Sequence, residues 1–165
     1  FHQGFAAYAD ARAKELCAPR RGEKNLLGYF LDNELVWWGA DKSRPLADGL
    51  YDTVAKLPAG HSARKALETF KEKRGPDKTA FLAYAAEKYF SVLTAAVRKY
   101  DPNHLILGVR FAGFNGAHPV VIKACGRYCD IVSFNFYPCV DLERNAVFLD
   151  CGVKLFKHSY ALRKA

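Results

Sequence analysis

The sequence contains no methionine, and its 165 residues begin with Phe1. A chain read from its own initiation site begins with methionine, so we expect this sequence to be part of a longer protein, with any signal peptide upstream of it. Long hydrophobic runs are also missing, because no apolar stretch approaches the roughly 18 residues that a membrane-spanning helix requires. We therefore expect no membrane-spanning segment within these residues.

The sequence has 5 cysteines, but it lacks the cysteine and histidine spacing of a metal site. No CxxC pair occurs, and Cys125 and Cys129 form a CxxxC spacing without histidine partners. We therefore expect no zinc or other metal site and no cofactor. Buried free thiols are the simpler interpretation of the cysteines, and they leave the redox compartment open.

A nucleic-acid-binding motif is missing as well. The net charge is +8, but the lysines and arginines are scattered among acidic residues and match no such motif. We interpret them as solvated surface residues and expect no nucleic-acid partner. The composition, 50% hydrophobic and 25% charged, is typical of a globular domain with its own core.

The sequence does contain an alternation of predicted helices and apolar strands. Apolar periodicity predicts helices at residues 5–17, 79–100 and 119–128, with shorter helices within 46–57 and 62–73. Near-continuous apolar runs predict strands buried on both faces at 26–31, 104–111 and 130–137. This order favours an α/β fold of βα repeats with a parallel sheet. His104 and His118 are expected to be surface or loop residues.

The first predicted strand ends in the polar residues Asp32, Asn33 and Glu34. The carboxyl ends of parallel strands are where ligands bind and catalytic residues lie in α/β folds. Glu34 is therefore the leading candidate for a functional residue, and a capping or salt-bridge role is the alternative. Arg110 ends the second predicted strand at the same edge. We expect it either to contact a substrate or to pair with a buried acid.

Three segments carry a resemblance to a known family. LLGYFLDNELVWWG, YFSVLTAAVRKYDPNHLILGVRF and CDIVSFNFYP resemble, in this order, segments of the clan of retaining glycoside hydrolases in which an Asn-Glu pair ends the fourth strand of a (β/α)8 barrel. The resemblance is to the agarase and β-galactosidase-like branches. It implies that residues 1–138 form a partial TIM-barrel catalytic domain, roughly strands four to six with their helices. Residues 139–165 stay unassigned, with apolar residues that allow one more strand or a hairpin around Cys151.

The resemblance also implies roles for single residues. Glu34 is the expected general acid/base, and Asn33 is expected to bond the sugar hydroxyl next to the anomeric carbon. Trp37 and Trp38 either stack on sugar rings or cover the core.

Two further substrate-site candidates lie at the end of the third strand. Tyr137 is placed where the clan has a tyrosine that holds the nucleophile, and Asn135 where many relatives have histidine. The family resemblance alone suggests a secreted or periplasmic protein, and the oligomeric state stays open.

A retaining glycosidase needs a second carboxylate about 5 to 5.5 Å from the acid/base. Asp32 lies one pleat deeper and is a poor nucleophile, while Glu143 and Asp150 follow too soon for a full intervening helix. A closed barrel also needs about 200 to 250 residues. The leading hypothesis is therefore a fragment of a retaining glycoside hydrolase that acts on a galactose-containing polysaccharide, inactive when isolated. The alternatives are an inactive carbohydrate-binding or structural remnant and, on charge alone, a nucleic-acid-binding module.

Overall fold

The computed structural model describes residues 1–35, 37, 49–111, 118–135, 139–141 and 146–148. The chain divides into two compact units, Phe1–Phe134 and Asn135–Ala165. In the second unit, the strands β3 (Cys139–Asp141) and β4 (Ala146–Phe148) pair in an antiparallel sheet. The sequence left this segment unassigned, and Cys151 and the residues around it lie outside the described residues.

The first unit is rich in helices, whose bounds follow from local signals. Asp77 caps the longest helix by accepting a hydrogen bond from the backbone N–H of Ala80 (3.0 Å), and a proline opens the last helix at its first turn. The helices predicted at 5–17, 62–73, 79–100 and 119–128 are confirmed within one residue at each end, and a shorter helix lies within 46–57 as predicted. The helices are α1 (Phe5–Leu16), the short 3-10 helix η1 (Ala18–Arg20), α2 (Leu50–Ala55), α3 (Ser62–Arg74), α4 (Lys78–Tyr100) and α6 (Pro119–Tyr128). Among the described helices, none combines the length and the apolar character needed to cross a membrane.

A small parallel sheet joins the first two predicted strands. Strand β1 (Gly28–Tyr29) pairs with β2 (Leu105–Ile106), with Gly28 opposite Leu105. A third parallel segment follows at the other edge of the second strand, where Phe111 pairs with Phe134. The predicted parallel order of βα units is therefore present, although the regular strands are shorter than the apolar runs that predicted them.

Close backbone approaches explain two glycines of the sheet. A Cβ atom added to Gly28 would lie 2.1 Å from the carbonyl oxygen of Leu105, so only glycine fits this strand pairing. Gly108 has a φ of +78°, and a Cβ atom there would lie 3.0 Å from the carbonyl oxygen of Ile131 and 3.2 Å from the sulfur of Cys125. The second strand therefore leaves its regular geometry at Gly108, just before Val109 and Arg110.

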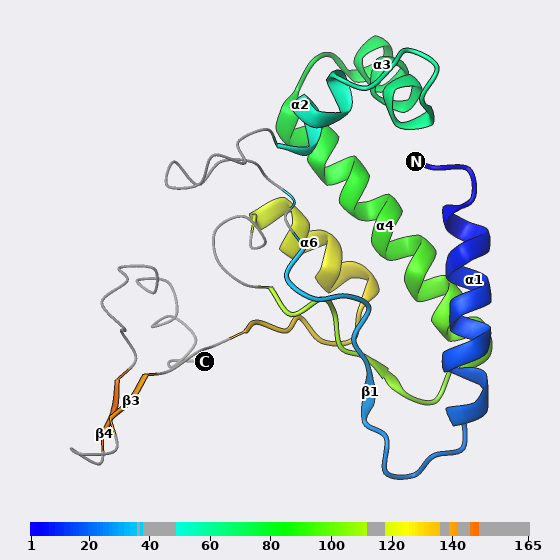
Figure 1. Cartoon of the computed structure of the whole chain (residues 1–165), viewed down its shortest axis with the longest axis vertical. Coiled ribbons are helices and arrows are strands. Elements are labelled where there is room, and N and C mark those ends of the chain that lie inside the picture. Colours follow the sequence, from blue (N-terminus) through cyan, green and yellow to red (C-terminus); the bar gives the residue numbers. More distant parts are fainter. Residues whose placement is uncertain (36, 38–48, 112–117, 136–138, 142–145, 149–165) are drawn as a thin grey trace. The chain divides into compact units, whose positions relative to one another are not determined.

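Helix α4 is the central element of the core. It lies between α1 and α6 (Figure 1) and packs against both of them. Ala86, Phe90 and Thr94 are also buried, so the core stripe predicted from the apolar periodicity was too narrow. That stripe comprised Phe81, Leu82, Ala85, Tyr89, Val92, Leu93, Ala96, Val97 and Tyr100. A helix that packs against neighbours on two sides buries more than the single face that its periodicity predicts.

The prediction that the first strand is buried on both faces is wrong for the described chain. Tyr29 and Leu31 pack towards α1 and α4, but Phe30, which alternates with them onto the other face, is 47% exposed. Within the part of the chain that the structure describes, helices cover only one face of this strand. The apolar run nevertheless gives the strand its position in the fold.

A buried carboxylate joins the amino-terminal ends of the strands. Asp101, fully buried where α4 ends, accepts hydrogen bonds from the hydroxyl of Tyr29 (2.6 Å) and from the backbone N–H groups of Asn103 and His104. The imidazole Nδ1 of His104 lies 2.6 Å from the same carboxylate, and its Nε2 lies 2.8 Å from the carbonyl oxygen of Glu23. His104 lies in the loop between α4 and β2, which was one of its two expected positions, but this network buries it.

Candidate active site at the carboxyl ends of the strands

Glu34 and Arg110 meet at one edge of the parallel sheet. The backbone N–H of Leu31 donates to the carbonyl oxygen of Gly108 (2.8 Å), and that of Glu34 donates to the carbonyl oxygen of Val109 (3.2 Å). Glu34 is thus bonded to the neighbouring strand at Val109, the residue that precedes Arg110. The placement of both residues at the carboxyl ends of strands agrees with the prediction, while their chemical roles stay predictions.

Both residues have unusual backbone conformations. Glu34 has a φ of 51° and Arg110 a φ of 47°, and no other non-glycine residue in the described ranges has a positive φ. The left-handed region costs a residue with a side chain roughly 1 to 2 kcal/mol. Such residues persist only where the surrounding structure fixes them, and they concentrate at functional sites. The backbone therefore marks these two positions independently of the sequence motif.

Asp32 takes part in holding the turn that leads to Glu34. One carboxylate oxygen accepts from the backbone N–H of Asn33 (2.9 Å), and the other accepts from the hydroxyl of Tyr89 on α4 (3.1 Å). Burial and the nearby negative charge of Asp32 raise the pKa of Tyr89, so its hydroxyl remains a donor. These contacts give Asp32 a part in holding the turn, while its weakness as a nucleophile stays a prediction.

Trp37 lies in the core behind this turn. Its side chain is 7% exposed, its ring stacks on Phe90 with the centroids 5.9 Å apart, and it meets Tyr89 edge-on at 5.1 Å. Its indole nitrogen has no hydrogen-bond partner among the described residues. This packing is that of a core residue, which was one of the two interpretations of the tryptophan pair.

Arg110 lies over an aromatic ring. Its guanidinium carbon is 5.1 Å from the centroid of Phe30, which is 47% exposed. A cation over the face of an aromatic ring gives an exposed arginine a preferred direction. An exposed apolar ring and a guanidinium therefore lie together on the face of the sheet that the described helices leave open.

The other predicted site residues are described only in part. Asn33 is exposed in the turn before Glu34. Asn135 directly follows the paired residue Phe134 and begins the second compact unit. Trp38 and Tyr137 lie outside the described residues.

Two residues of this edge were not found by sequence reasoning. Tyr89 was assigned to the core stripe of α4, and Phe30 was assigned to a buried strand. A signal existed for Tyr89, because a tyrosine in an apolar stripe needs a partner for its hydroxyl. Its partner Asp32 is 57 positions away in the sequence, and helical periodicity carries no information about such a contact.

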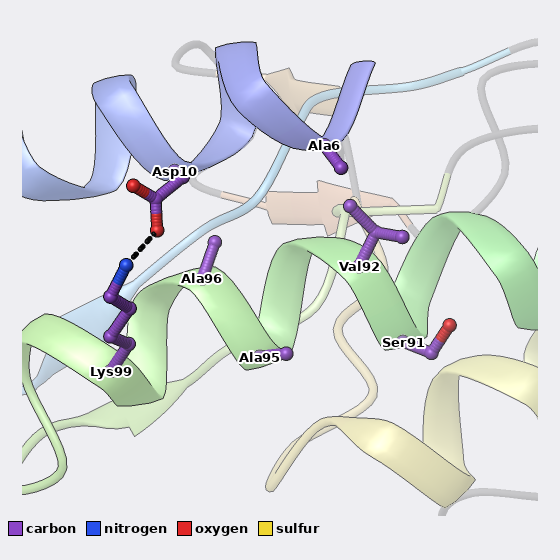
Figure 2. Close-up of a pocket in the computed structure, with 7 residues that line it drawn as sticks. All are labelled: Ala6, Asp10, Ser91, Val92, Ala95, Ala96 and Lys99. Carbon is purple, nitrogen blue, oxygen red and sulfur yellow. Dashed lines mark hydrogen bonds and ion pairs between the residues drawn. The ribbon is translucent and has the colours of Figure 1, made fainter. Parts of the chain in front are cut away.

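A hollow of about 330 Å³ lies elsewhere, on the outer side of α1 and α4 (Figure 2). Its ionisable residues are Asp10 and Lys99, which pair with each other at 2.7 Å. The hydrogen bonds from Lys99 and Tyr100 lower the pKa of Asp10, so the acid is already occupied by partners on α4. Mostly alanine and valine make up the rest of its wall, and we assign it no catalytic role. The residues around it are Ala6, Asp10, Ser91, Val92, Ala95, Ala96 and Lys99.

The described residues do not provide a set of ligands for a metal ion. No group of three or more histidine, cysteine, aspartate or glutamate side chains among them could hold a metal ion. Among the described cysteines, Cys17, Cys125 and Cys129 are free thiols, and the first two are buried as expected.

Comparison with known proteins points to agarases. No protein-family model matches the chain. Its sequence is 30% identical to beta-agarase A of Vibrio sp. (strain JT0107) over 175 residues, covering 81% of this chain and 17% of the agarase. Beta-agarase B of the same strain is 39% identical over 61 residues, covering 37% of this chain and 6% of that protein.

The structure shows the same similarity. It matches the crystal structure of an agarase, AgWH50C, with a TM-score of 0.66 and 29% sequence identity over 82% of this chain and 22% of that one. The resemblance to agarases inferred from three sequence segments is thus confirmed by sequence and by structure. This chain spans less than a quarter of the length of each of these three proteins.

Proposed function

We propose that this chain is the acid/base-bearing part of a retaining glycoside hydrolase that acts on a galactose-containing polysaccharide such as agar. The observation that carries the proposal is the placement of Glu34. A glutamate with a left-handed backbone ends a parallel strand and is bonded to the neighbouring strand, in a chain similar to agarases. A carboxyl group fixed at this edge is suited to donate and accept a proton.

The proposed fold is part of a (β/α)8 barrel. Strands β1 and β2 and the segment that contains Phe134 correspond to strands four to six, and α1, α4 and α6 belong to the surrounding ring of helices. In such a barrel the open face of the sheet, with Phe30 and Arg110, is turned towards the interior. Arg110 is then in reach of a substrate bound above the carboxyl ends of the strands.

In the proposed reaction, Glu34 first protonates the glycosidic oxygen of the leaving group and later removes a proton from the attacking water. Asn33 bonds the hydroxyl next to the anomeric carbon, and Arg110, Asn135, Trp38 and Tyr137 contribute substrate contacts. Asp32 is engaged by Tyr89 and by the backbone, so we expect the nucleophile to come from polypeptide beyond the described residues.

A chimeric enzyme tests the role of Glu34. In beta-agarase A of Vibrio, the aligned segment is replaced by this chain, and the rate of agarose hydrolysis is measured. We expect the chimera to hydrolyse agarose and Glu34→Gln to lower kcat at least about a thousandfold, because the amide cannot transfer the proton. The control Glu72→Gln changes an exposed glutamate on α3 and leaves the rate unchanged.

Two results of this experiment would contradict the proposal. A Glu34→Gln chimera as active as its parent would exclude Glu34 as the acid/base. The anomeric configuration of the first product, followed by proton NMR, tests the stereochemistry, and an inverted product would exclude the retaining mechanism. If the chimera binds agarose oligosaccharides but neither it nor any variant hydrolyses them, the inactive carbohydrate-binding alternative is favoured.

The isolated chain is expected to have no measurable glycosidase activity. The carboxylates described at this edge of the sheet are Glu34 and Asp32, and Asp32 already accepts hydrogen bonds from Tyr89 and from the backbone N–H of Asn33. Release of reducing sugar from agarose is the measurement. Turnover by the isolated chain that Glu34→Gln abolishes would show that the nucleophile lies within these 165 residues.

A further inference from the structure

Tyr89 lies on α4, away from the carboxyl ends of the strands, yet it contacts the chain on both sides of Glu34. Its hydroxyl donates to Asp32, two residues before Glu34, at 3.1 Å. Its ring meets the indole of Trp37, three residues after Glu34, with the centroids 5.1 Å apart. We propose that Tyr89 is a positioning residue: through its contacts with Asp32 and Trp37 it fixes the backbone of Glu34. This inference rests on the proposed function of Glu34.

The hydrogen bond to Asp32 fixes the entry to the turn. The second oxygen of the same carboxylate accepts from the backbone N–H of Asn33 (2.9 Å), so the carboxylate joins α4 to the backbone immediately before Glu34. With the carboxylate held by Tyr89, the peptide between Asp32 and Asn33 keeps its orientation. Rotation of this peptide would break the bond to Asn33 and move the next residue.

The ring contact fixes the exit from the turn. Trp37 is held between Tyr89, which it meets edge-on, and Phe90, on which it stacks. Phe90 is fully buried in the core beneath. Two consecutive residues of α4 therefore determine where the chain lies after Glu34.

Tyr89 is itself packed against two further aromatic rings. Its ring stacks on Phe5 of α1 with the centroids 6.1 Å apart and meets Phe90 edge-on at 5.1 Å. Its hydroxyl remains protonated, because burial and the charge of Asp32 raise its pKa. Both contacts of Tyr89 are therefore maintained over the pH range in which a glutamate acid/base works.

Between these two fixed points, the backbone of Glu34 has little freedom. Its N–H bonds to the carbonyl oxygen of Val109 (3.2 Å), and its φ of 51° is a conformation that an unconstrained glutamate avoids. The sequence distance between Asp32 and Tyr89 shows that the constraint comes from the tertiary structure and not from the turn itself. Loss of the hydroxyl is expected to release Glu34 towards ordinary backbone conformations.

Amide hydrogen exchange in the full 165-residue chain tests the constraint without any activity. In Tyr89→Phe, the ring remains and only the hydroxyl is lost. We expect the amides of Asn33 and Glu34 to exchange about fivefold faster, the factor expected from the loss of one hydrogen bond. The amide of Leu107, which bonds to Tyr29 in the middle of the sheet, is expected to keep its rate.

The helix offers a matched control. Tyr100, at the other end of α4, donates its hydroxyl to Asp10 at 2.9 Å. Tyr100→Phe therefore removes the same kind of hydrogen bond from the same helix, far along the chain from Glu34. We expect Tyr100→Phe to leave the exchange of Asn33 and Glu34 unchanged.

The agarase chimera tests the effect on catalysis. We expect Tyr89→Phe to lower kcat about tenfold with KM within twofold, because a displaced acid/base affects the reaction more than substrate binding. Tyr100→Phe is expected to keep kcat within twofold at a similar loss of thermal midpoint. Asp32→Ala is expected to lower kcat similarly, and Tyr89→Phe added to it is expected to have no further effect.

The outcomes separate this inference from the proposed function. If Glu34→Gln abolishes activity while Tyr89→Phe keeps kcat within twofold, the positioning role is wrong and the acid/base role stands. Equal losses of kcat in Tyr89→Phe and Tyr100→Phe would also overturn the positioning role. If Glu34→Gln is fully active, the proposed function fails. Independently of activity, unchanged amide exchange at Asn33 and Glu34 in Tyr89→Phe would show that Tyr89 does not constrain this turn.

Discussion

Among single residues, Asp101 and His104 form a buried pair whose charges depend on pH. Burial works to raise the pKa of Asp101, but the hydrogen bonds from Tyr29, His104 and two backbone amides outweigh it and lower the pKa to about 2. The contacts with the carbonyl oxygen of Glu23 and with Asp101 raise the pKa of His104. Both partners of this imidazole accept hydrogen bonds, so the protonated ring satisfies both of them.

This pair predicts a pH range of greatest stability. The lowered pKa of Asp101 stabilises the fold above its ordinary pKa, about 4, and this contribution is lost as the pH falls towards 2. The raised pKa of His104 stabilises the fold below about pH 6.5, and this contribution is lost as the pH rises through the raised value. The contribution of the pair to the free energy of unfolding is therefore greatest between about pH 4 and 6.5.

Asp101→Asn tests this prediction by urea unfolding at several pH values. We expect a loss of about 3 kcal/mol near pH 5, because His104 and Tyr29 lose a charged buried partner, and a smaller loss at pH 2.5 and at pH 9. The control Asp52→Asn affects an exposed ion pair with Lys78 and is expected to cost less than about 1 kcal/mol. A loss that is the same at every pH would contradict the assignment of charges.

Among the elements, α4 connects every part of the core of the first unit. Its side chains contribute to the cluster with α6 and Trp37, to the cluster with α1 and β2, and to the cluster with α2 and α3. Phe90 is fully buried in the first of these clusters, against the turn that carries Glu34. Stability and site geometry therefore depend on the same helix.

Phe90→Ala is expected to lower the free energy of unfolding by about 3 to 5 kcal/mol, since it removes a large buried ring and leaves a cavity. Urea unfolding followed by circular dichroism at 222 nm measures the loss. The control Tyr8→Ala removes a ring that is 65% exposed on α1 and is expected to cost less than about 1 kcal/mol. If both substitutions cost the same, α4 does not have the central role described above.

The elements could be predicted from sequence to different degrees, for physical reasons. The helices followed from periodicity, caps and prolines, all of which are local signals. The ends of β1 and β2 were predicted less well, because the break at Gly108 depends on the approach of Ile131 and Cys125 from elsewhere in the chain.

The site was predicted in the same partial way. Glu34 and Arg110 could be placed at strand ends from the pattern alone, whereas their left-handed backbones could not, since non-glycine residues rarely adopt them. The burial of His104 and the role of Tyr89 arise from long-range hydrogen bonds that no sequence period records.

At the scale of the whole molecule, the first unit contains the described helices, the parallel sheet and the buried clusters. A unit with its own core is expected to fold without the rest of the chain. We therefore expect a chain that ends at Phe134 to keep its helical circular dichroism and to unfold cooperatively, with a free energy of unfolding within about 1 kcal/mol of the full chain. Loss of the cooperative transition would show that residues after Phe134 complete the core.

The backbone of Glu34 has a consequence for the balance between stability and activity. Glycine adopts a φ of 51° without steric cost, whereas alanine keeps the cost that a Cβ atom brings. Glu34→Gly and Glu34→Ala lose the same side-chain contacts, so Glu34→Gly is expected to be about 1 kcal/mol more stable than Glu34→Ala in urea unfolding. Equal stability of the two variants would exclude backbone strain at this position. If the gain is observed, a residue with a side chain is less favourable for folding here than glycine. Retention of a glutamate there is the trade-off expected when a carboxyl group is kept for chemistry at the expense of stability.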